Sequence, residues 1–179
     1  VYVPIDPAYP AARIATMVTD CGARLIIASA AHESSLAALG IRVLAIEQLV
    51  APVGDDAADF PIEPSLPGDA AYVFYTSGTT GQPKGVLASR ANLAQYVGSA
   101  IRRYELVPDD VMPCLARATF SISLFELLAP LACGAASLVL DRDHVLDAPR
   151  LATTLQDVTI FHAGPSLLKN LLTHVESQH

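Results

Sequence analysis

Basic residues are scarce in this chain, and this scarcity argues against some classes of binding partner. The 179 residues include 11 Lys and Arg against 18 Asp and Glu, which gives a formal net charge of −7. A generic binder of nucleic acid or of anionic membranes needs a basic surface, so neither partner is expected. A nucleotide site remains compatible with this charge, because it needs only a few local donors.

Paired cysteines, metal-ligand clusters and long apolar runs are also lacking. The three cysteines are far apart, with no CxxC pair and no Cys/His cluster. This pattern predicts buried free thiols in a reducing cytoplasm and no metal site. No apolar run has transmembrane length, and no signal-peptide pattern opens the chain. We therefore expect a soluble cytoplasmic protein.

Apolar residues make up 52% of the chain, enough for one domain with a packed core. Short apolar runs alternate with segments of helical periodicity, which predicts an α/β fold with a mostly parallel sheet flanked by helices. The expected strands are 1–5, 24–29, 41–46, 69–75, 85–88, 111–116, 136–140 and 158–161. The expected helices are 11–20 with Gly22 after its end, 31–39, 92–104 with Asn92 as N-cap, 123–133 kinked or ended by Pro130, 149–155 and 166–175.

One loop between two expected strands has the composition of a phosphate site. Residues 75–85 read YTSGTTGQPKG. The glycines free backbone N–H groups to point inward, four hydroxyl side chains add short donors, and one lysine adds a positive charge. The candidate phosphate-binding residues are Thr76, Ser77, Gly78, Thr79, Thr80, Gly81 and Lys84.

The spacing of this loop excludes two common nucleotide motifs. A Walker P-loop requires G-x-x-x-x-G-K-[ST] opening a helix, whereas here Lys84 follows Gly81 by three residues and the chain returns to a strand. The dinucleotide pattern G-x-G-x-x-G is not matched either. The remaining alternative is a flexible hairpin rich in turn residues.

The loop resembles the phosphate loop of the adenylate-forming superfamily, which includes peptide synthetase adenylation domains, acyl- and aryl-CoA synthetases, and luciferases. Residues 1–14, VYVPIDPAYPAARI, resemble the AYVPIDPxYPxxRI signature of nonribosomal peptide synthetase adenylation domains. Residues 120–135 are similar to the next core motif, FDxSxxExxxPLxxGA, and residues 162–168 are similar to a segment beside the acyl pocket. The resemblance covers nearly the whole chain.

This resemblance implies an enzyme that joins a carboxylic acid to the α-phosphate of Mg²⁺-bound ATP and passes the acyl group to a carrier-protein phosphopantetheine thiol. It implies that Thr76, Ser77, Thr79, Thr80 and Lys84 hold the β- and γ-phosphates. The physical reason is stabilisation of the pyrophosphate leaving group by preorganised donors.

The resemblance also implies an acid pocket. Its residues would be Phe120, Ser121, Ile122, Phe125, His162 and Gly164. Core packing is an equal alternative for the three apolar members, and a satisfied, partly buried histidine is the default for His162. Glu126 could lie on the helix surface or act as a local polar anchor.

Ser121 departs from the family pattern. Domains that load α-amino acids usually have an aspartate there, which pairs with the α-ammonium group. A serine cannot neutralise a buried cation. We therefore expect an aryl, hydroxy or keto acid, or an amino acid with a displaced amine, unless an acidic residue elsewhere takes over this role.

The family's upstream helices, its adenine- and ribose-binding motifs, its hinge and its C-terminal catalytic lysine are not found in these residues. We therefore expect residues 1–179 to be a single α/β segment of an adenylation core, with no catalytic residue assigned and no adenylation by the segment alone. The alternatives are a segment of an acyl- or aryl-CoA ligase, or a non-catalytic excised subdomain.

Overall fold

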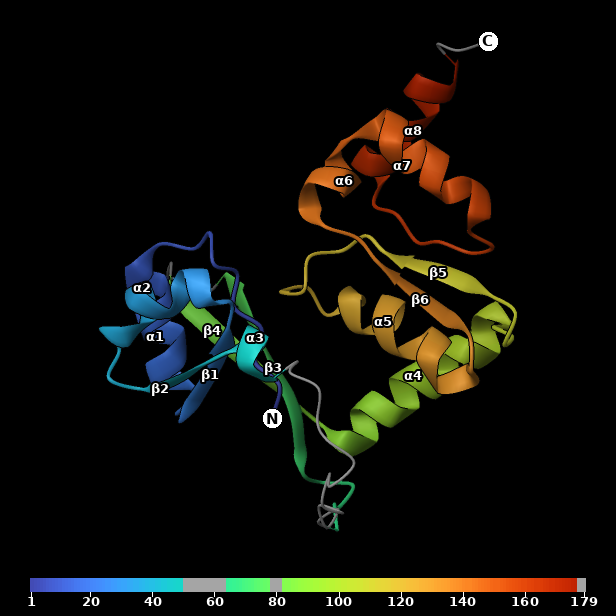
Figure 1. The fold of residues 1–179 in the computed structure, drawn as a ribbon. Helices are drawn as coiled ribbons and strands as arrows, with labels where there is room; N and C mark the ends of the chain where they lie inside the picture. Colours follow the sequence, from blue (N-terminus) through green and yellow to red (C-terminus); the bar gives the residue numbers. More distant parts are fainter. Residues whose placement is uncertain (50–63, 78–81, 177–179) are drawn as a thin grey trace. The chain divides into compact units, whose positions relative to one another are not determined.

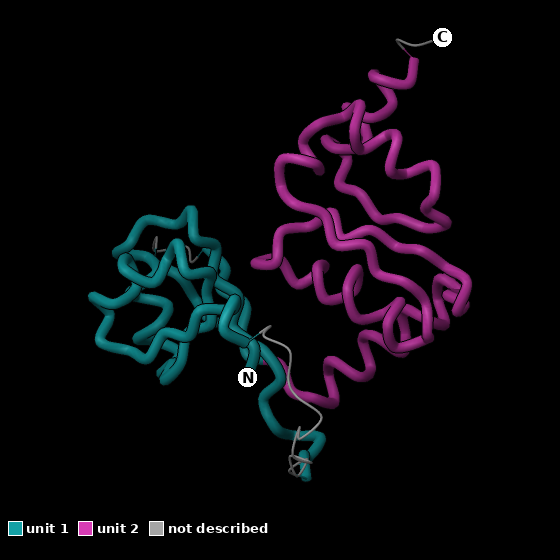
Figure 2. The backbone as a smooth tube through the Cα atoms, viewed as in Figure 1, with its two compact units in different colours: residues 1–87 teal, residues 88–179 magenta. Residues whose placement is uncertain are grey.

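The computed structural model describes residues 1–49, 64–77 and 82–176. They form two compact units, residues 1–87 and residues 88–179, coloured separately in Figure 2. Each unit combines helices with paired strands (Figure 1), which confirms the predicted α/β class. The prediction that residues 1–179 act as one segment of a larger catalytic core stays a prediction.

The first unit is built around two pairs of strands. Strands β1 (Leu25–Ala28) and β2 (Arg42–Ala45) pair in parallel, and β3 (Ala70–Ser77) pairs with β4 (Pro83–Ser89). The helical elements of this unit are α1 (Ala11–Asp20), η1 (Ala30–His32), α2 (Glu33–Ala37) and α3 (Ile46–Leu49). One helix over 31–39 was expected where the structure has η1 followed by α2. Helix α3 was not predicted, because its four residues are too few for a periodic signal.

Helix α1 follows its sequence pattern closely. Met17 and Val18 are buried, as their helical spacing with Ile14 predicts. Gly22 adopts a φ of +63°, the left-handed conformation that glycine permits. The amide of Gly22 bonds the Thr19 carbonyl and that of Ala23 bonds the Val18 carbonyl, a Schellman motif that ends the helix.

Residues 1–5 were expected to form a strand, but only one residue pairs. Tyr2 forms an isolated parallel bridge with Tyr72 of β3. Its amide donates to the Ala71 carbonyl and its carbonyl accepts from the Val73 amide, both at 2.9 Å. Pro4 has no amide hydrogen, so it cannot extend this pairing.

In the second unit, a parallel strand pair lies between two groups of helices (Figure 1). The pair consists of β5 (Val111–Cys114) and β6 (Ala136–Val139). One group of helices is α4 (Arg90–Tyr104) and α5 (Ile122–Cys133). The other group is α6 (Arg142–Leu146), α7 (Ala148–Thr154) with the short η2 (Leu155–Asp157), and α8 (Pro165–Glu176). Helix α6 was not predicted.

Two apolar clusters hold the second unit together. Met112 of β5 packs with Phe125 and Ala129 of α5 in one cluster, which α4 completes. Leu151 of α7 and Leu171 of α8 anchor the other. All five side chains are at most 5% exposed, so burial of apolar area, at about 25 cal/mol per Å², is a main stabilising contribution here.

The start of α4 corrects one prediction. Asn92 was expected to be the N-cap, but the N-cap is Ser89. The Ser89 hydroxyl accepts the Asn92 amide, and the Asn92 side chain accepts the Ser89 amide, each at 3.2 Å. Both residues are therefore capping residues, and their reciprocal bonds form a capping box that starts the helix two residues earlier.

Segment 158–161 was expected to be a strand, and this prediction is wrong. The amides of Thr159 and Ile160 both point to one acceptor, the Val111 carbonyl, at 3.2 and 3.5 Å. The Val111 amide donates to the Thr159 hydroxyl instead of a backbone carbonyl. A side chain thus takes the place that a ladder bond would need.

Helix α5 continues past Pro130 to Cys133, so the proline does not end it. Proline has no amide hydrogen to donate to the carbonyl four residues earlier. That carbonyl belongs to Glu126, and it accepts the Ser137 hydroxyl of β6 at 3.2 Å instead. Gly134, with a φ of +87°, ends the helix.

Candidate functional site

The described ends of the phosphate-loop candidate lie side by side in the first unit. Thr76 and Ser77 end β3, Lys84 is the second residue of β4, and all three are exposed. The Thr76 hydroxyl donates to the Lys84 carbonyl at 3.4 Å, which ties the two strands together at this end. Gly78, Thr79, Thr80 and Gly81 lie outside the described residues.

The positive charge of the loop candidate is open to a ligand. The Lys84 ammonium makes no ion pair with any residue that the structure describes. With two hydroxyl side chains nearby, this exposed cation gives the loop end the donors that a polyphosphate requires.

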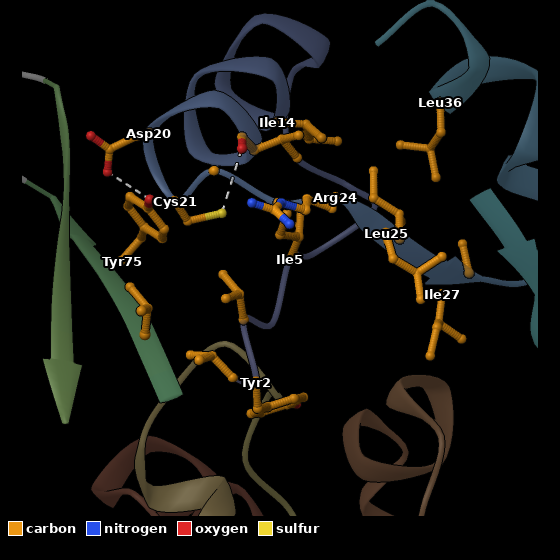
Figure 3. Close-up of a pocket in the computed structure, with 18 of the residues that line it drawn as sticks. Tyr2, Ile5, Ile14, Asp20, Cys21, Arg24, Leu25, Ile27, Leu36 and Tyr75 are labelled. Atoms are coloured by element: carbon orange, nitrogen blue, oxygen red, sulfur yellow. Dashed lines mark hydrogen bonds between the residues drawn. The ribbon is translucent and has the colours of Figure 1, made fainter. Parts of the chain in front are cut away.

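The strand residues that flank the loop are fixed by packing and hydrogen bonds. The Tyr75 hydroxyl lies 2.6 Å from the Asp20 carboxylate (Figure 3). It also lies 3.1 Å from the Met17 carbonyl. Burial raises the pKa of Tyr75 far above its usual value of 10, and the Asp20 carboxylate raises it further. Tyr75 therefore remains a neutral hydrogen-bond donor over the physiological pH range.

Gly85 has a steric role on the neighbouring strand. A Cβ atom added there would lie 3.0 Å from the Val73 side chain and 3.2 Å from the Tyr75 ring. These distances are tighter than ordinary van der Waals contact, so a side chain at position 85 would require Val73 and Tyr75 to shift by a few tenths of an ångström.

The same unit contains a cavity of about 1260 Å³, which was not predicted from the sequence. Apolar side chains from β1 and α1, among them Leu25, Ile27 and Ile14, line much of it (Figure 3). Tyr75 and Gly85 belong to its lining. Leu25 and Ile27 are about half exposed. No periodic signal marks such a surface, because it depends on elements far apart in the chain.

The acid-pocket candidates belong to the second unit, around the start of α5. Phe120 is 61% exposed. Ser121 is also exposed, and its side chain makes no capping hydrogen bond with the helix that it precedes. Ile122 packs partly buried against the core cluster of Met112 and Phe125. The apolar aromatic at position 120 and the hydroxyl at 121 are thus available at the surface.

Phe125 packs in the core, and its role in an acid pocket stays a prediction. Its side chain is 4% exposed and belongs to the core. Its ring meets His162 edge to face, with centroids 6.3 Å apart. The His162 side chain is 47% exposed, and a partly buried histidine was expected. Gly164 is exposed two residues further on, just before α8.

Glu126 is the polar anchor that connects these segments. It is 1% exposed and is the one buried charged residue among residues 1–49, 64–77 and 82–176. One carboxylate oxygen accepts the amides of Leu115 and Ala116, each at 2.8 Å. The other oxygen lies 3.6 Å from Nδ1 of His162. Glu126 thus joins α5 to the end of β5 and to the segment before α8.

Burial raises the pKa of the Glu126 carboxyl, and the amides of Ala116 and Leu115, together with His162, oppose this shift. The sequence left the role of Glu126 open. Its one signal is a single charged residue inside the apolar run ISLFELLAPLAC. A charge at such a position is seldom buried without partners.

The described residues contain no group of three or more His, Cys, Asp or Glu side chains that could hold a metal ion. None of the helices within the described ranges is both long and apolar enough to cross a membrane. All three cysteines are free thiols of intermediate burial, less buried than predicted.

Comparison with known proteins gives a match over the whole chain. A family described as AMP-binding enzyme matches residues 1–179. Syringomycin synthase SyrB1 of Pseudomonas syringae pv. syringae is 36% identical over 174 residues, covering 95% of this chain and 28% of that protein. An L-proline–[L-prolyl-carrier protein] ligase of Streptomyces coelicolor is 31% identical, covering 96% of this chain and 36% of that protein.

A solved structure is also similar to this chain over its whole length. The nonribosomal peptide synthetase FmoA3, in its AMPPNP-bound form, has a TM-score of 0.81 at 30% identity, covering all of this chain and 19% of that one. This chain therefore spans little more than a third, or less, of the length of these proteins.

Proposed function

The chain belongs to the family of AMP-binding enzymes, and we propose that it forms part of an enzyme that activates a carboxylic acid with ATP. The product would be an acyl-adenylate, and the acyl group would then pass to the phosphopantetheine thiol of a carrier protein. A nonribosomal peptide synthetase among the similar solved structures and a carrier-protein ligase among the relatives support this proposal.

The observation that carries the proposal is the arrangement at the ends of β3 and β4. Two hydroxyl side chains, Thr76 and Ser77, and the exposed ammonium of Lys84, which makes no ion pair within the described part of the chain, lie together on an exposed edge. These groups fit the β- and γ-phosphates of ATP. Their chemical role is to stabilise the negative charge that develops on pyrophosphate as it leaves, which lowers the barrier to formation of the acyl-adenylate.

Mg²⁺ would reach this site with the nucleotide. Mg²⁺ is usually held by one or two carboxylates together with substrate phosphates, and it keeps several waters. The described residues contain no dedicated metal cluster, which suits a metal that arrives on the phosphates. When bound, the ion would add positive charge beside the β- and γ-phosphates.

The substrate class follows from the start of α5. An α-ammonium group buried in the acid pocket needs a carboxylate partner, and residue 121 is a serine. The nearby carboxylate of Glu126 is already engaged by two backbone amides and faces His162. We therefore assign to this enzyme an aryl, hydroxy or keto acid, or an amino acid with a displaced amine.

The proposal also covers the cellular compartment and the parts of the active site that this segment supplies. Three free cysteines fit a reducing cytoplasm. Residues 1–179 would supply the phosphate-binding groups and one wall of the acid pocket. The residues of that wall would be Phe120, Ser121, Ile122, Phe125, His162 and Gly164. Adenine recognition and the catalytic lysine would come from other parts of the synthetase, so this segment alone would not form an adenylate.

The test is ATP–pyrophosphate exchange by the complete synthetase that carries this chain, with a panel of aryl, hydroxy, keto and α-amino acids. We expect exchange with one of the first three classes or with an amine-displaced amino acid. Lys84→Ala should lower the exchange rate by about 10²-fold, because one preorganised charge at the leaving group is lost.

The matched control is Lys169→Ala. Lys169 is the only other lysine in the chain, and it is exposed on α8. This variant should exchange like the wild type. No exchange with any acid would refute the proposed function, whereas best exchange with an ordinary α-amino acid would refute only the substrate class.

A further inference from the structure

Asp20 occupies a position that helix energetics do not explain. It is the last residue of α1. A negative charge at a helix C-terminus interacts unfavourably with the helix dipole. The carboxylate instead accepts the hydroxyl of Tyr75, 55 residues away in the sequence, at 2.6 Å (Figure 3). A bond this short between a hydroxyl and a charged acceptor is among the stronger hydrogen bonds in proteins.

Tyr75 stands at the base of the candidate phosphate loop. It immediately precedes Thr76 on β3, and its ring lies beside Gly85, which immediately follows Lys84 on β4; a Cβ atom added at Gly85 would be 3.2 Å from the ring. The ring of this β3 residue therefore lies beside β4, while its hydroxyl is bound to the end of α1 by Asp20 and the Met17 carbonyl.

We propose that Tyr75, Asp20 and Gly85 form a clamp that sets the separation and direction of the two strand ends carrying Thr76, Ser77 and Lys84. Tyr75 is then a positioning residue for phosphate binding, and it touches no substrate itself. This inference rests on the proposed function. Its physical basis is that phosphate donors act through preorganised geometry, and a displacement of about 1 Å can cost about 10²-fold in rate.

The clamp gives each member a separable role. The hydroxyl of Tyr75 fixes the orientation of the ring, because it is hydrogen-bonded to the end of α1. The absence of a side chain at Gly85 allows the close approach of the ring, because a Cβ there would require the Tyr75 side chain to shift by a few tenths of an ångström. Asp20 supplies the acceptor, so an amide in its place keeps an acceptor oxygen but loses the charge.

The experiment measures ATP–pyrophosphate exchange by the complete synthetase, with KM for ATP and KM for the acid determined separately. Tyr75→Phe removes the hydroxyl and keeps the ring. We expect it to raise KM for ATP by about tenfold and to leave KM for the acid unchanged. Asp20→Ala should match it, the double variant should be no worse than either single variant, and Asp20→Asn should restore part of the affinity.

The matched control is Tyr72→Phe. Tyr72 lies on the same strand, and its hydroxyl makes no hydrogen bond that the structure shows to the described residues. It should leave both KM values unchanged. Thermal unfolding of every variant shows whether the fold is intact, and Asp20→Asn keeps the test possible if Tyr75→Phe does not fold.

The outcomes separate the two claims. Exchange by the wild type with equal ATP affinity in the Tyr75→Phe and Tyr72→Phe variants would overturn the clamp and leave the proposed function standing. An equal rise of both KM values in the Tyr75→Phe variant would show general structural damage and would also overturn it. A wild-type enzyme without exchange would refute the function on which the clamp rests.

Discussion

Replacing Glu126 tests how much the second unit depends on one buried carboxylate. In the Glu126→Ala variant, the amides of Leu115 and Ala116 lose their shared acceptor, which lies 2.8 Å from each. A buried donor left without a partner costs about 1–3 kcal/mol. Leu115 is buried and Ala116 is partly buried, so we expect a total loss of about 2–5 kcal/mol in the free energy of unfolding.

This loss is large compared with the usual stability of a domain, about 5–15 kcal/mol. Urea unfolding of the 179-residue chain, followed by circular dichroism, measures it by linear extrapolation. The control is Glu176→Ala, at the exposed end of α8, which should change the free energy by less than about 0.5 kcal/mol. A difference under about 1 kcal/mol between the two variants would refute the view that this carboxylate anchors the segments around β5.

Two more predictions concern the same unit. Burial raises the pKa of Glu126 above its ordinary 4.5, so the folded protein binds the proton more tightly than the unfolded chain, and stability falls as pH rises from about 4.5 through the raised value. Urea unfolding at a series of pH values should show this decline in the wild type and less of it in Glu126→Gln. Identical plots of the free energy of unfolding against pH would contradict the attribution of the decline to Glu126. Ser89→Ala removes the N-cap of α4 and half of its capping box, which should cost about 1 kcal/mol. Thermal unfolding measures this loss against Ser99→Ala on the exposed face of the same helix, and equal melting temperatures would show that the cap contributes nothing.

Local features of the fold could be predicted from the sequence because their causes lie within a few residues. Gly22 ends α1 as expected, since only a residue tolerant of positive φ fits there. The parallel pairing of β1 with β2 and of β5 with β6 follows from the strand–helix alternation. Asn92 was misplaced because Ser89, three residues away, has equally good capping chemistry, and only the geometry decides between them.

Contacts between distant segments could not be predicted. Which amides Glu126 reaches depends on how α5 packs on β5, and the apolar run around it does not encode this choice. The bond between Tyr75 and Asp20 joins residues 55 positions apart. The phosphate-loop prediction rests on composition and on family resemblance, and the roles of Thr76, Ser77 and Lys84 stay predictions until nucleotide binding is measured.

The role of the Ser137 hydroxyl depends on Pro130, although the two residues do not bond to each other. The proline leaves the Glu126 carbonyl without its helical donor, and the serine hydroxyl of β6 replaces that donor. The hydroxyl therefore matters for this carbonyl only while proline stands at position 130. One backbone carbonyl of α5 therefore takes its hydrogen bond from the neighbouring strand and not from its own helix. The position of β6 along α5 is thereby coupled to the backbone hydrogen bonding of the helix.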